Sequence, residues 1–590
     1  MCERAFGQTP ETGYLDDHDG MEEPMDAARE PTRPFARLVR SFGGPGAFGV
    51  VIGLALLCAA FLAVQGLQPC DNAYITFRHV RNLIEHGRPA WNLSGAPVLG
   101  STTPAFIFTL ALFSLLPGID QVDHAALLLN TGMQFLIVVF AYLVARDFLR
   151  KTFPAILLTI LVAFNAVSIY IFSQGFESSM LAAVLLAALY FLRIGRVRLP
   201  VVLASVAPLI RPEGVLLTVI VSAYLLRARR CNARLLLCYL PIPLLWLAGA
   251  TAYYGSPIPH AILAEKKFPM IHRPYADAEI SLSGRLPKTL SGAADLFRAK
   301  AGPVLLDGSF EPGDDSMGRQ TRHWIMLLGL PLAIAGFFLR PDGRIVYLAY
   351  PPLFLALYGW IGHTMDWYFP SFILFANMLL FGGWARAIHA TGDRLSGGFA
   401  LFVRRWKIAQ IACLLVFAVF ATANDYSINR GAYRHTNRAF CFPEHPHGEL
   451  WEQFDNNRYH HYRAAAEHLN GLSKKNAVAM ISEVGVFGYH YEGDVIDTVG
   501  LCSPEALAFY PPNRWEVFDV FGNYRVKANN FVPEEMVMTL RPEFLVNSRF
   551  YMANLLDEGS RFLGAYEQIY EGGIVWGERV AIYQRRDENR

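Results

Sequence analysis

Long apolar runs alternate with short polar stretches between residues 46 and 423. Crossing the hydrocarbon core of a bilayer takes about 20 residues of α-helix, and these runs reach or approach that length. The pattern therefore predicts a polytopic α-helical membrane domain with eleven spans. The expected spans are 47–67, 127–144, 155–173, 179–192, 199–210, 214–226, 235–254, 324–339, 346–362, 372–385 and 408–421.

Basic residues collect at alternate ends of these runs. Because cytoplasmic loops of membrane proteins are enriched in Lys and Arg, this bias predicts a cytoplasmic N-terminus. An odd number of spans then leaves the C-terminus outside. The basic residues expected inside are Arg33, Arg37, Arg40, Arg146, Arg150, Lys151, Arg193, Arg196, Arg198, Arg227, Arg229, Arg230, Arg340 and Arg344.

The apolar residues 104–116 are too few for a span and fit an interfacial or re-entrant helix better. If they crossed the membrane, Arg146 and Arg150 would lie outside. We therefore expect a long outer loop at 69–126, and a second at 255–323.

The two ends of the chain differ from the spans. Residues 1–45 are polar and lack apolar periodicity, which predicts a disordered cytoplasmic tail. No cleavage site follows the first apolar run, so this tail is not a signal peptide. Residues 424–590 have short alternating runs such as AVAMISEVG and DVIDTVG, which are typical of strands. They predict an extracytoplasmic soluble domain of α/β type.

Composition supports a membrane protein: 53% of residues are hydrophobic and 17% are charged, whereas soluble domains are about a quarter charged. A net charge of +2 without a basic block gives no sign of nucleic-acid binding. Cys441 and Cys502 both lie in the expected outer domain. They are able to form a disulfide in an oxidising compartment, and free thiols are the alternative.

The polar residues with chemical potential all map to the expected outer ends of spans. Ionisable groups at a membrane edge are costly and usually functional, so this convergence predicts one outward-facing site at the water–lipid boundary. These residues are Asp71, Glu177, Arg211, Glu213, His260, Lys266, Lys267 and Asp366.

Asp71 opens the stretch CDNAYITFRHVRNL, residues 70–83, which follows the first span. Phe77, Val80, Leu83 and Ile84 share one helical face, so the stretch predicts an amphipathic helix along the interface. Asp is a preferred N-cap, so Asp71 is a candidate for the cap of this helix. It is also a candidate for a catalytic role. The two roles are compatible.

Seven motifs occur in the order found in the GT-C glycosyltransferases. The chain resembles in particular the terminal arabinofuranosyltransferases of the mycobacterial cell wall and their uncharacterised bacterial relatives. The motifs are CDNAYITFRHVRNL (70–83), WN (91–92), GSTTP (100–104), GFESSM (175–180), RPEG (211–214), YGSPIPHAILAEK (254–266) and SEVGVFGYHYEGDVIDTVGLCSP (482–504).

The resemblance implies a multi-pass enzyme of the bacterial inner membrane that takes a sugar from a polyprenyl-phosphate donor. The acceptor would be an envelope glycan, glycolipid or glycoprotein on the outer face, and the displacement would invert the anomeric centre. Asp71 would be the general base, and cationic side chains would hold the lipid phosphate. No cofactor is expected, and metal dependence stays open. The implied substrate-binding residues are Asn72, Arg78, Glu177, Arg211, Glu213, His260 and Lys266.

Two motifs depart from the family pattern. The family shows a pair of acids where this chain has Asp71 and Asn72, so only Asp71 remains to take a proton. In PHAILAEK, relatives have Asn at the position of His260 and Lys at that of Glu265, which places Lys266 one residue late.

Other interpretations stay open. Arg211 is also suited to be an anchor that snorkels to the interface, and Glu177 to cap the helix that follows it. A transporter or flippase for an envelope lipid is a rival class, although no internal repeat is visible between the halves. Asn72 keeps open a non-catalytic scaffold for envelope assembly. The sugar, hexose or pentose, is undetermined; arabinofuranose is one possibility by resemblance.

Overall fold

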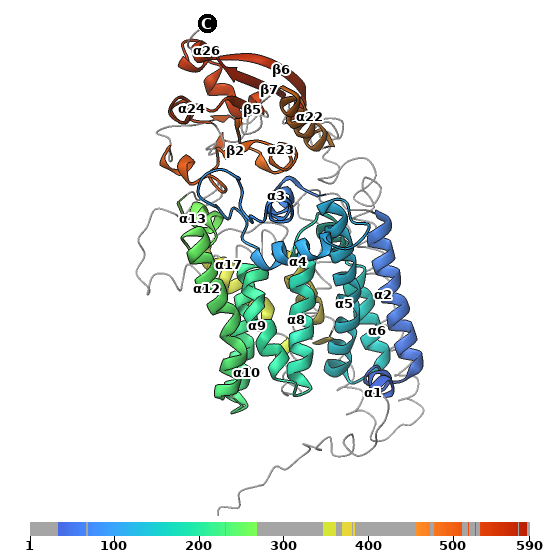
Figure 1. Ribbon diagram of the computed structural model, residues 1–590. Helices are drawn as coiled ribbons and strands as arrows, with labels where there is room; N and C mark the ends of the chain where they lie inside the picture. The colour runs from blue at the N-terminus through green and yellow to red at the C-terminus, as the bar shows by residue number, and fades with distance from the viewer. Residues whose placement is uncertain are drawn as a thin grey trace, which may run out of the picture.

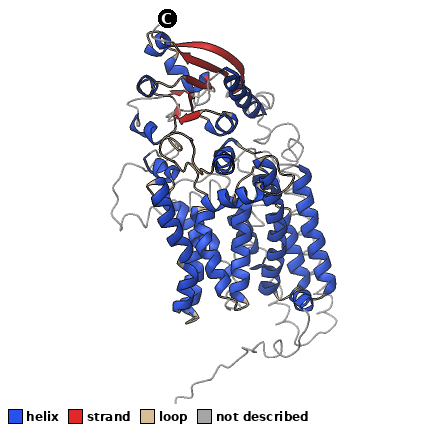
Figure 2. Ribbon diagram, in the orientation of Figure 1, coloured by secondary structure: helices blue, strands red, loops and turns tan. Residues whose placement is uncertain are grey.

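The computed structural model combines a bundle of long helices with a smaller domain at one end of it (Figure 1). All the strands in the described part of the chain lie in this smaller, C-terminal domain (Figure 2). The predicted fold class, a polytopic helical membrane protein with a C-terminal soluble α/β-type domain, is confirmed. The structure describes residues 34–65, 69–230, 232–267, 346–347, 349–361, 368–379, 382–383, 456–472, 477–509, 517–518, 525–526, 532–575 and 578–586.

The bundle follows the apolar runs closely. Among the described residues, three helical segments are long and apolar enough to cross a membrane: Pro45–Val64, Val122–Leu149 and Ala233–Tyr254. The predicted spans at 324–339 and 408–421 lie outside the described residues. The predicted total of eleven spans therefore stays a prediction. The bundle helices are α2 (Pro45–Gln65), α5 (Val122–Leu149), α6 (Thr152–Ala163), α7 (Ala166–Ser173), α8 (Ser178–Arg193), α9 (Arg198–Ile210), α10 (Val215–Arg227), α11 (Ala233–Tyr239), α12 (Pro241–Tyr254), α17 (Tyr350–Ile361) and Phe369–Leu379.

The predicted continuous span at 155–173 is wrong, because two helices, α6 and α7, cover it. Asn165 interrupts the run and caps α7 by accepting a hydrogen bond from the backbone nitrogen of Ser168, at 2.9 Å. Asn is a preferred N-cap because its side-chain oxygen satisfies an N–H that the helix leaves unpaired. A single polar residue therefore divides an otherwise apolar run.

Part of the expected disordered tail is helical: α1 spans Pro34–Ser41. The residue that follows it, Phe42, is buried and stacks on Tyr142 of α5 with ring centroids 5.6 Å apart. The Tyr142 hydroxyl also donates to the backbone oxygen of Phe42, at 2.7 Å. These contacts fix the end of α1 against the bundle. Residues 1–33 lie outside the described part of the chain.

Three helices lie where the bundle meets the C-terminal domain: α3 (Asp71–His86), α4 (Pro104–Ser114) and α13 (His260–Lys267). Helix α4 runs across the end of the bundle, as expected of an interfacial or re-entrant helix (Figure 1). Helix α3 lies between the bundle and the C-terminal domain (Figure 1). Residues 73–80 of α3 are all buried within the protein, so this part of the helix packs on protein on both faces.

The C-terminal domain is built on a five-stranded sheet of order β2-β1-β5-β7-β6. Strands β2, β1 and β5 are parallel, and β7 and β6 are antiparallel additions. The stretches AVAMISEVG and DVIDTVG form β1 and β2, which confirms the strand prediction. The elements are α22 (Asn456–Leu472), β1 (Val478–Ile481), α23 (Val484–His490), β2 (Asp494–Asp497), η5 (Pro504–Phe509), β3 (Val517–Phe518), β4 (Arg525–Val526), α24 (Glu534–Leu540), β5 (Phe544–Ser548), α25 (Arg549–Met552), η6 (Ala553–Leu555), α26 (Arg561–Ala565), β6 (Tyr566–Val575) and β7 (Glu578–Arg585).

Candidate functional site

Asp71 forms hydrogen bonds with the C-terminal domain. Its carboxylate accepts hydrogen bonds from the backbone nitrogens of Val486, at 2.8 Å, and Gly485, at 3.2 Å. These N–H groups belong to the first turn of α23, which has no partners for them within the helix. The interpretation of Asp71 as the cap of its own helix is wrong, because Cys70 occupies that position and Asp71 is the first residue of α3. Asp71 instead caps a helix of the other domain.

Two glycines let α23 approach this closely. A Cβ on Gly485 would lie 1.7 Å from the backbone oxygen of Asp71. A Cβ on Gly488 would lie 2.7 Å from the ring of Trp91. Both distances are far below van der Waals contact, so the spacing GVFG in the sequence reflects direct packing of α23 on α3 and on the loop after it.

Arg78 and Arg81 bind the opposite end of α23. The Arg78 guanidinium is buried and donates to the backbone oxygens of Trp91, at 2.7 Å, and Gly493, at 2.9 Å. It also stacks on the Trp91 ring, 4.8 Å from the centroid. Arg81 donates to the backbone oxygen of Tyr489. Thus an acid meets the N-terminus of α23 and two cations meet its C-terminus, which matches the polarity of the helix dipole.

The predicted substrate-binding role of Arg78 therefore competes with a structural one. A guanidinium has five N–H donors and no acceptor. In this structure, Arg78 also donates to Gly488, to Tyr491 at 3.2 Å and to the Asn92 side chain at 3.3 Å. Its donors are thus directed at protein acceptors. We call α3 and α23, with Asp71, Arg78 and Arg81, the docking helix pair.

The motif WN extends the sheet. The Asn92 side chain accepts from the backbone nitrogen of Val495, at 2.9 Å, and donates to the backbone oxygen of the same residue, at 3.0 Å. The Trp91 indole donates to that oxygen as well, at 2.9 Å. Val495 lies in β2, at the edge of the sheet, where backbone groups would otherwise lack partners. The Asn92 side chain thus forms the pair of backbone hydrogen bonds that a neighbouring strand would form with β2.

The motifs GSTTP and PHAILAEK meet the loop after β2. A Cβ on Gly100 would lie 2.3 Å from the sulfur of Cys502, whose thiol is free and buried. Cys441, the predicted disulfide partner, lies outside the described residues. His260 donates its backbone N–H to Leu99, at 2.9 Å, and its imidazole lies 3.0 Å from the backbone oxygen of Gly500. Burial lowers the pKa of His260, so the neutral ring donates to this carbonyl.

Two other predicted site residues, Asn72 and Lys266, show no contact that would define a role in the described structure. Asn72 follows Asp71 in α3, and its side chain is exposed. Lys266 belongs to α13, but its side chain lies outside the described part.

Asp497 is a residue that sequence reasoning missed. Its carboxylate is buried and accepts from the backbone nitrogens of Val499, at 2.8 Å, and Cys502, at 2.9 Å. Burial raises its pKa to about 6, against the opposing effect of these backbone hydrogen bonds. An Asp just before a turn such as TVG often bonds to the backbone two residues on, and this signal was available in the sequence. Asp497 shapes the loop that contacts Gly100 and His260.

Arg211 lies in a separate cluster with Glu177 and Glu213, which we call the arginine triad. Its Nε donates to Glu213, at 2.5 Å, and Nη1 donates to Glu177. The guanidinium also stacks on Tyr368, 4.6 Å from the ring centroid. Because all three charged residues are buried, the interpretation of Arg211 as a snorkelling anchor is wrong. Glu177 stands at the N-cap of α8 without a capping bond from its side chain, because it pairs with Arg211 instead.

Close packing against α9 explains the glycine of the motif RPEG. Its glycine, Gly214, lies so close to α9 that a Cβ there would be 2.1 Å from the backbone oxygen of Ala207. This tight turn brings Glu213 back beside Arg211. With both carboxylates ionised, the triad carries one excess negative charge, and Glu213 Oε2 has no hydrogen-bond partner among the described residues.

The predicted site residues thus form two groups. The docking helix pair and its neighbouring loops gather Asp71, Arg78 and His260 at the junction of the two domains. The arginine triad gathers Glu177, Arg211 and Glu213 among α8, α9 and α10. In the ranges that the structure describes, no group of three or more His, Cys, Asp or Glu side chains is arranged to hold a metal ion.

Solved structures with the same architecture exist. The chain is similar to ArnT from Cupriavidus metallidurans in the apo state, with 13% identity and a TM-score of 0.53. It is similar to the same protein bound to undecaprenyl phosphate, with 12% identity and a TM-score of 0.52. Each match covers 91% of this chain and 98% of the other. No protein-family model and no curated protein matches the chain. At this identity the likeness shows the fold, and the predicted GT-C fold is confirmed.

Proposed function

We propose that this protein is a GT-C-type membrane glycosyltransferase. It moves a sugar from a polyprenyl-phosphate donor to an envelope glycan, glycolipid or glycoprotein at the outer face of the bacterial inner membrane. The observation that carries the proposal is the likeness to ArnT over 91% of the chain, in a structure that contains undecaprenyl phosphate. The chain would lie with its N-terminus in the cytoplasm, as the distribution of basic residues favours.

The architecture suits a lipid donor and a polar acceptor. Apolar helices end where α3, α4 and α13 meet the C-terminal domain, so a lipid-borne phosphate and a soluble hydroxyl can approach the same level. Polar groups gathered at such a boundary are costly and are usually kept for function. The junction is therefore the region where we place the reaction.

Asp71 is the proposed general base. The acceptor hydroxyl attacks the anomeric carbon while Asp71 takes its proton, and the bond from that carbon to the phosphate oxygen breaks. The polyprenyl phosphate leaves with the electron pair, and the anomeric centre inverts. The N–H groups of Gly485 and Val486 both donate to this carboxylate. Those bonds would hold the carboxylate in one orientation.

A second candidate function is supported by the same residue. Asp71 already has a docking role, and Asn72 replaces the second acid of the family pair. Both observations favour a non-catalytic membrane scaffold for envelope assembly. Such a scaffold would need the docking contacts of Asp71 but not its basicity.

The substitution Asp71→Asn separates these functions. Gly485 and Val486 donate to different carboxylate oxygens, so the single amide oxygen of Asn keeps one of these two bonds and α23 stays docked through it. Loss of a general base should lower the transfer rate by about a hundred- to ten-thousandfold with a polyprenyl-phosphate sugar donor. A loss below about tenfold would reject Asp71 as the base.

A comparison variant is Gly485→Ala, which keeps an ionisable carboxyl at position 71 but disturbs docking, because the added Cβ would lie 1.7 Å from the backbone oxygen of Asp71 and 2.9 Å from its carboxyl carbon. If Gly485→Ala lowers transfer as much as Asp71→Asn does, the loss comes from undocking and gives no support to Asp71 as the base. The scaffold function instead predicts no transfer by the unchanged protein. Limited proteolysis between the two domains reports docking in both variants independently of activity.

A further inference from the structure

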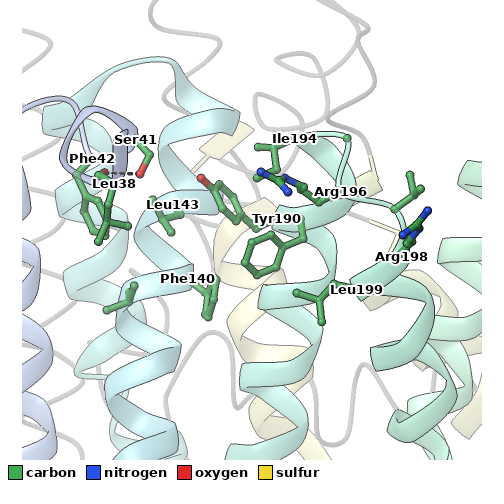
Figure 3. Close-up of a pocket in the computed structure, with 14 residues that line it drawn as sticks. Leu38, Ser41, Phe42, Phe140, Leu143, Tyr190, Ile194, Arg196, Arg198 and Leu199 are labelled. Atoms are coloured by element: carbon green, nitrogen blue, oxygen red, sulfur yellow. Dashed lines mark hydrogen bonds between the residues drawn. The ribbon is translucent and has the colours of Figure 1, made fainter. Parts of the chain in front are cut away.

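A cavity of about 870 Å³ opens at the end of the bundle away from the C-terminal domain. It lies between α1, α5, α8 and α9, and most of its lining is aliphatic or aromatic (Figure 3). Phe140 and Leu143 come from α5, Tyr190 from α8 and Leu199 from α9. The volume falls within the range of about 300–1,000 Å³ that is typical of small-molecule sites. The proposed transfer reaction makes no use of this cavity.

Two cations line the same cavity. Arg196 lies in the turn between α8 and α9, and Arg198 is the first residue of α9 (Figure 3). Both side chains are exposed, and within the described ranges neither has a carboxylate within ion-pair distance. The neighbouring Arg193 differs, because its guanidinium pairs with Asp147 at 3.2 Å. Among the described residues, Arg196 and Arg198 therefore offer two guanidinium groups without a paired carboxylate beside an apolar chamber.

Three apolar side chains that line the cavity are also exposed. Ile194 is 50% exposed, Leu199 is 43% exposed and Leu38 of α1 is 46% exposed. In a bilayer such residues meet lipid chains, whereas the arginines next to them lie at the level of the headgroups. Basic pockets between membrane helices bind anionic lipid headgroups in this arrangement.

We propose that this cavity binds an anionic phospholipid from the bilayer leaflet that lies away from the C-terminal domain. The headgroup phosphate contacts Arg196 and Arg198, whose planar guanidinium groups match phosphate oxygens in a bidentate way. One acyl chain enters between Phe140, Leu143 and Tyr190. A free phosphate ion would use the two arginines but not the chamber, and a zwitterionic lipid brings a cation of its own toward them.

The test uses the purified full-length protein and native mass spectrometry. Phosphatidylglycerol and phosphatidylcholine with identical acyl chains are titrated separately. We expect phosphatidylglycerol to bind more tightly, and the double variant Arg196→Ala/Arg198→Ala to weaken it by about thirtyfold, from the attraction of about two cations to anionic lipid. The control pair Arg227→Ala/Arg234→Ala removes two exposed arginines of α10 and α11 that do not line the cavity, and it should bind as the unchanged protein does.

A second variant tests the chamber alone. Leu199→Trp adds bulk to the cavity lining at a partly exposed position, so it should weaken phosphatidylglycerol binding while both arginines remain. Equal binding of the two lipids, or an equal loss in the control pair, would overturn the proposal in favour of general surface charge. Competition by inorganic phosphate at the concentration of the lipid would overturn it in favour of a simple anion site.

Discussion

The carboxylate of Asp71 lies 2.8 Å from the backbone nitrogen of Val486, a residue 415 positions further along the chain. This contact joins the segment after the first membrane helix to the C-terminal domain. Arg78 and Arg81 join α3 to the other end of α23, through the backbone oxygens of Gly488 and Tyr489. Residues whose types suggest chemistry therefore also determine how the soluble domain sits on the membrane domain.

Gly485→Ala should separate the docking helix pair. The added methyl group would meet the Asp71 backbone, which has no freedom to move away as a flexible side chain would. We expect faster proteolysis between the domains and faster hydrogen exchange in 484–490. Gly471→Ala is the matched control in α22, since nothing lies within 4 Å of its added Cβ. It should be neutral or stabilise by up to about 1 kcal/mol. Equal behaviour of the two variants would contradict close packing at Gly485.

Arg78→Lys should destabilise the protein although it keeps the charge. An ammonium cannot reproduce the fork that reaches the oxygens of Trp91, Tyr491 and Gly493. Hydrogen bonds from a charged donor contribute about 1.5–3 kcal/mol each, so a clear fall in the apparent Tm is expected. The control is Arg463→Lys, an exposed partner of Glu467 whose ion pair is worth at most about 1 kcal/mol. Similar Tm values for the two variants would show that the fork geometry is unimportant.

The helices and strands were predictable because their signals are local. Apolar run length indicated α2, α5 and the α11–α12 segment, and alternation indicated β1 and β2. The partner of Asp71 was not predictable, because the pairing depends on how two distant segments meet in space. The burial of Arg78 was not predictable for a related reason: a helical pattern with polar positions suggests water, whereas residues 73–80 of α3 are buried within the protein.

The arginine triad illustrates a second limit. Sequence position placed Arg211 at the tip of a helical hairpin, where water or a lipid phosphate was the expected neighbour. The structure buries it instead, because Glu177 from another helix and Glu213 from the same turn neutralise it. Charge pairing across helices leaves no periodic signal in one sequence, so burial could not be inferred from residue type.

Arg211→Met should destabilise the bundle by about 3–5 kcal/mol, the cost of leaving buried carboxylates without their partner. The triple variant Arg211→Met/Glu177→Gln/Glu213→Gln should recover part of that loss, since no ionised group remains. Arg227→Met, at the exposed end of α10, is the control and should change stability by less than about 0.5 kcal/mol. A variant Arg211→Met that stays stable but loses affinity for a polyprenyl-phosphate donor would instead support the phosphate-binding role.

Asp497 should make stability depend on pH in the mildly acidic range. Burial raises its pKa in the folded protein to about 6, above the value of about 3.9 for an unperturbed Asp. The folded state therefore binds the proton more tightly, so the stabilising contribution is complete below about pH 4 and is lost as the pH rises through about 6. Asp497→Asn has no such proton. Between about pH 7.5 and about pH 5, the unchanged protein should gain about 1.4 kcal/mol relative to this variant, measured as the difference in unfolding free energy or apparent Tm.

Asp497→Ala should show the same loss of pH dependence with lower stability throughout, because no side-chain oxygen then accepts from Val499 and Cys502. Parallel pH profiles for the unchanged protein and Asp497→Asn would mean that this carboxyl does not take up a proton in the folded state over this range.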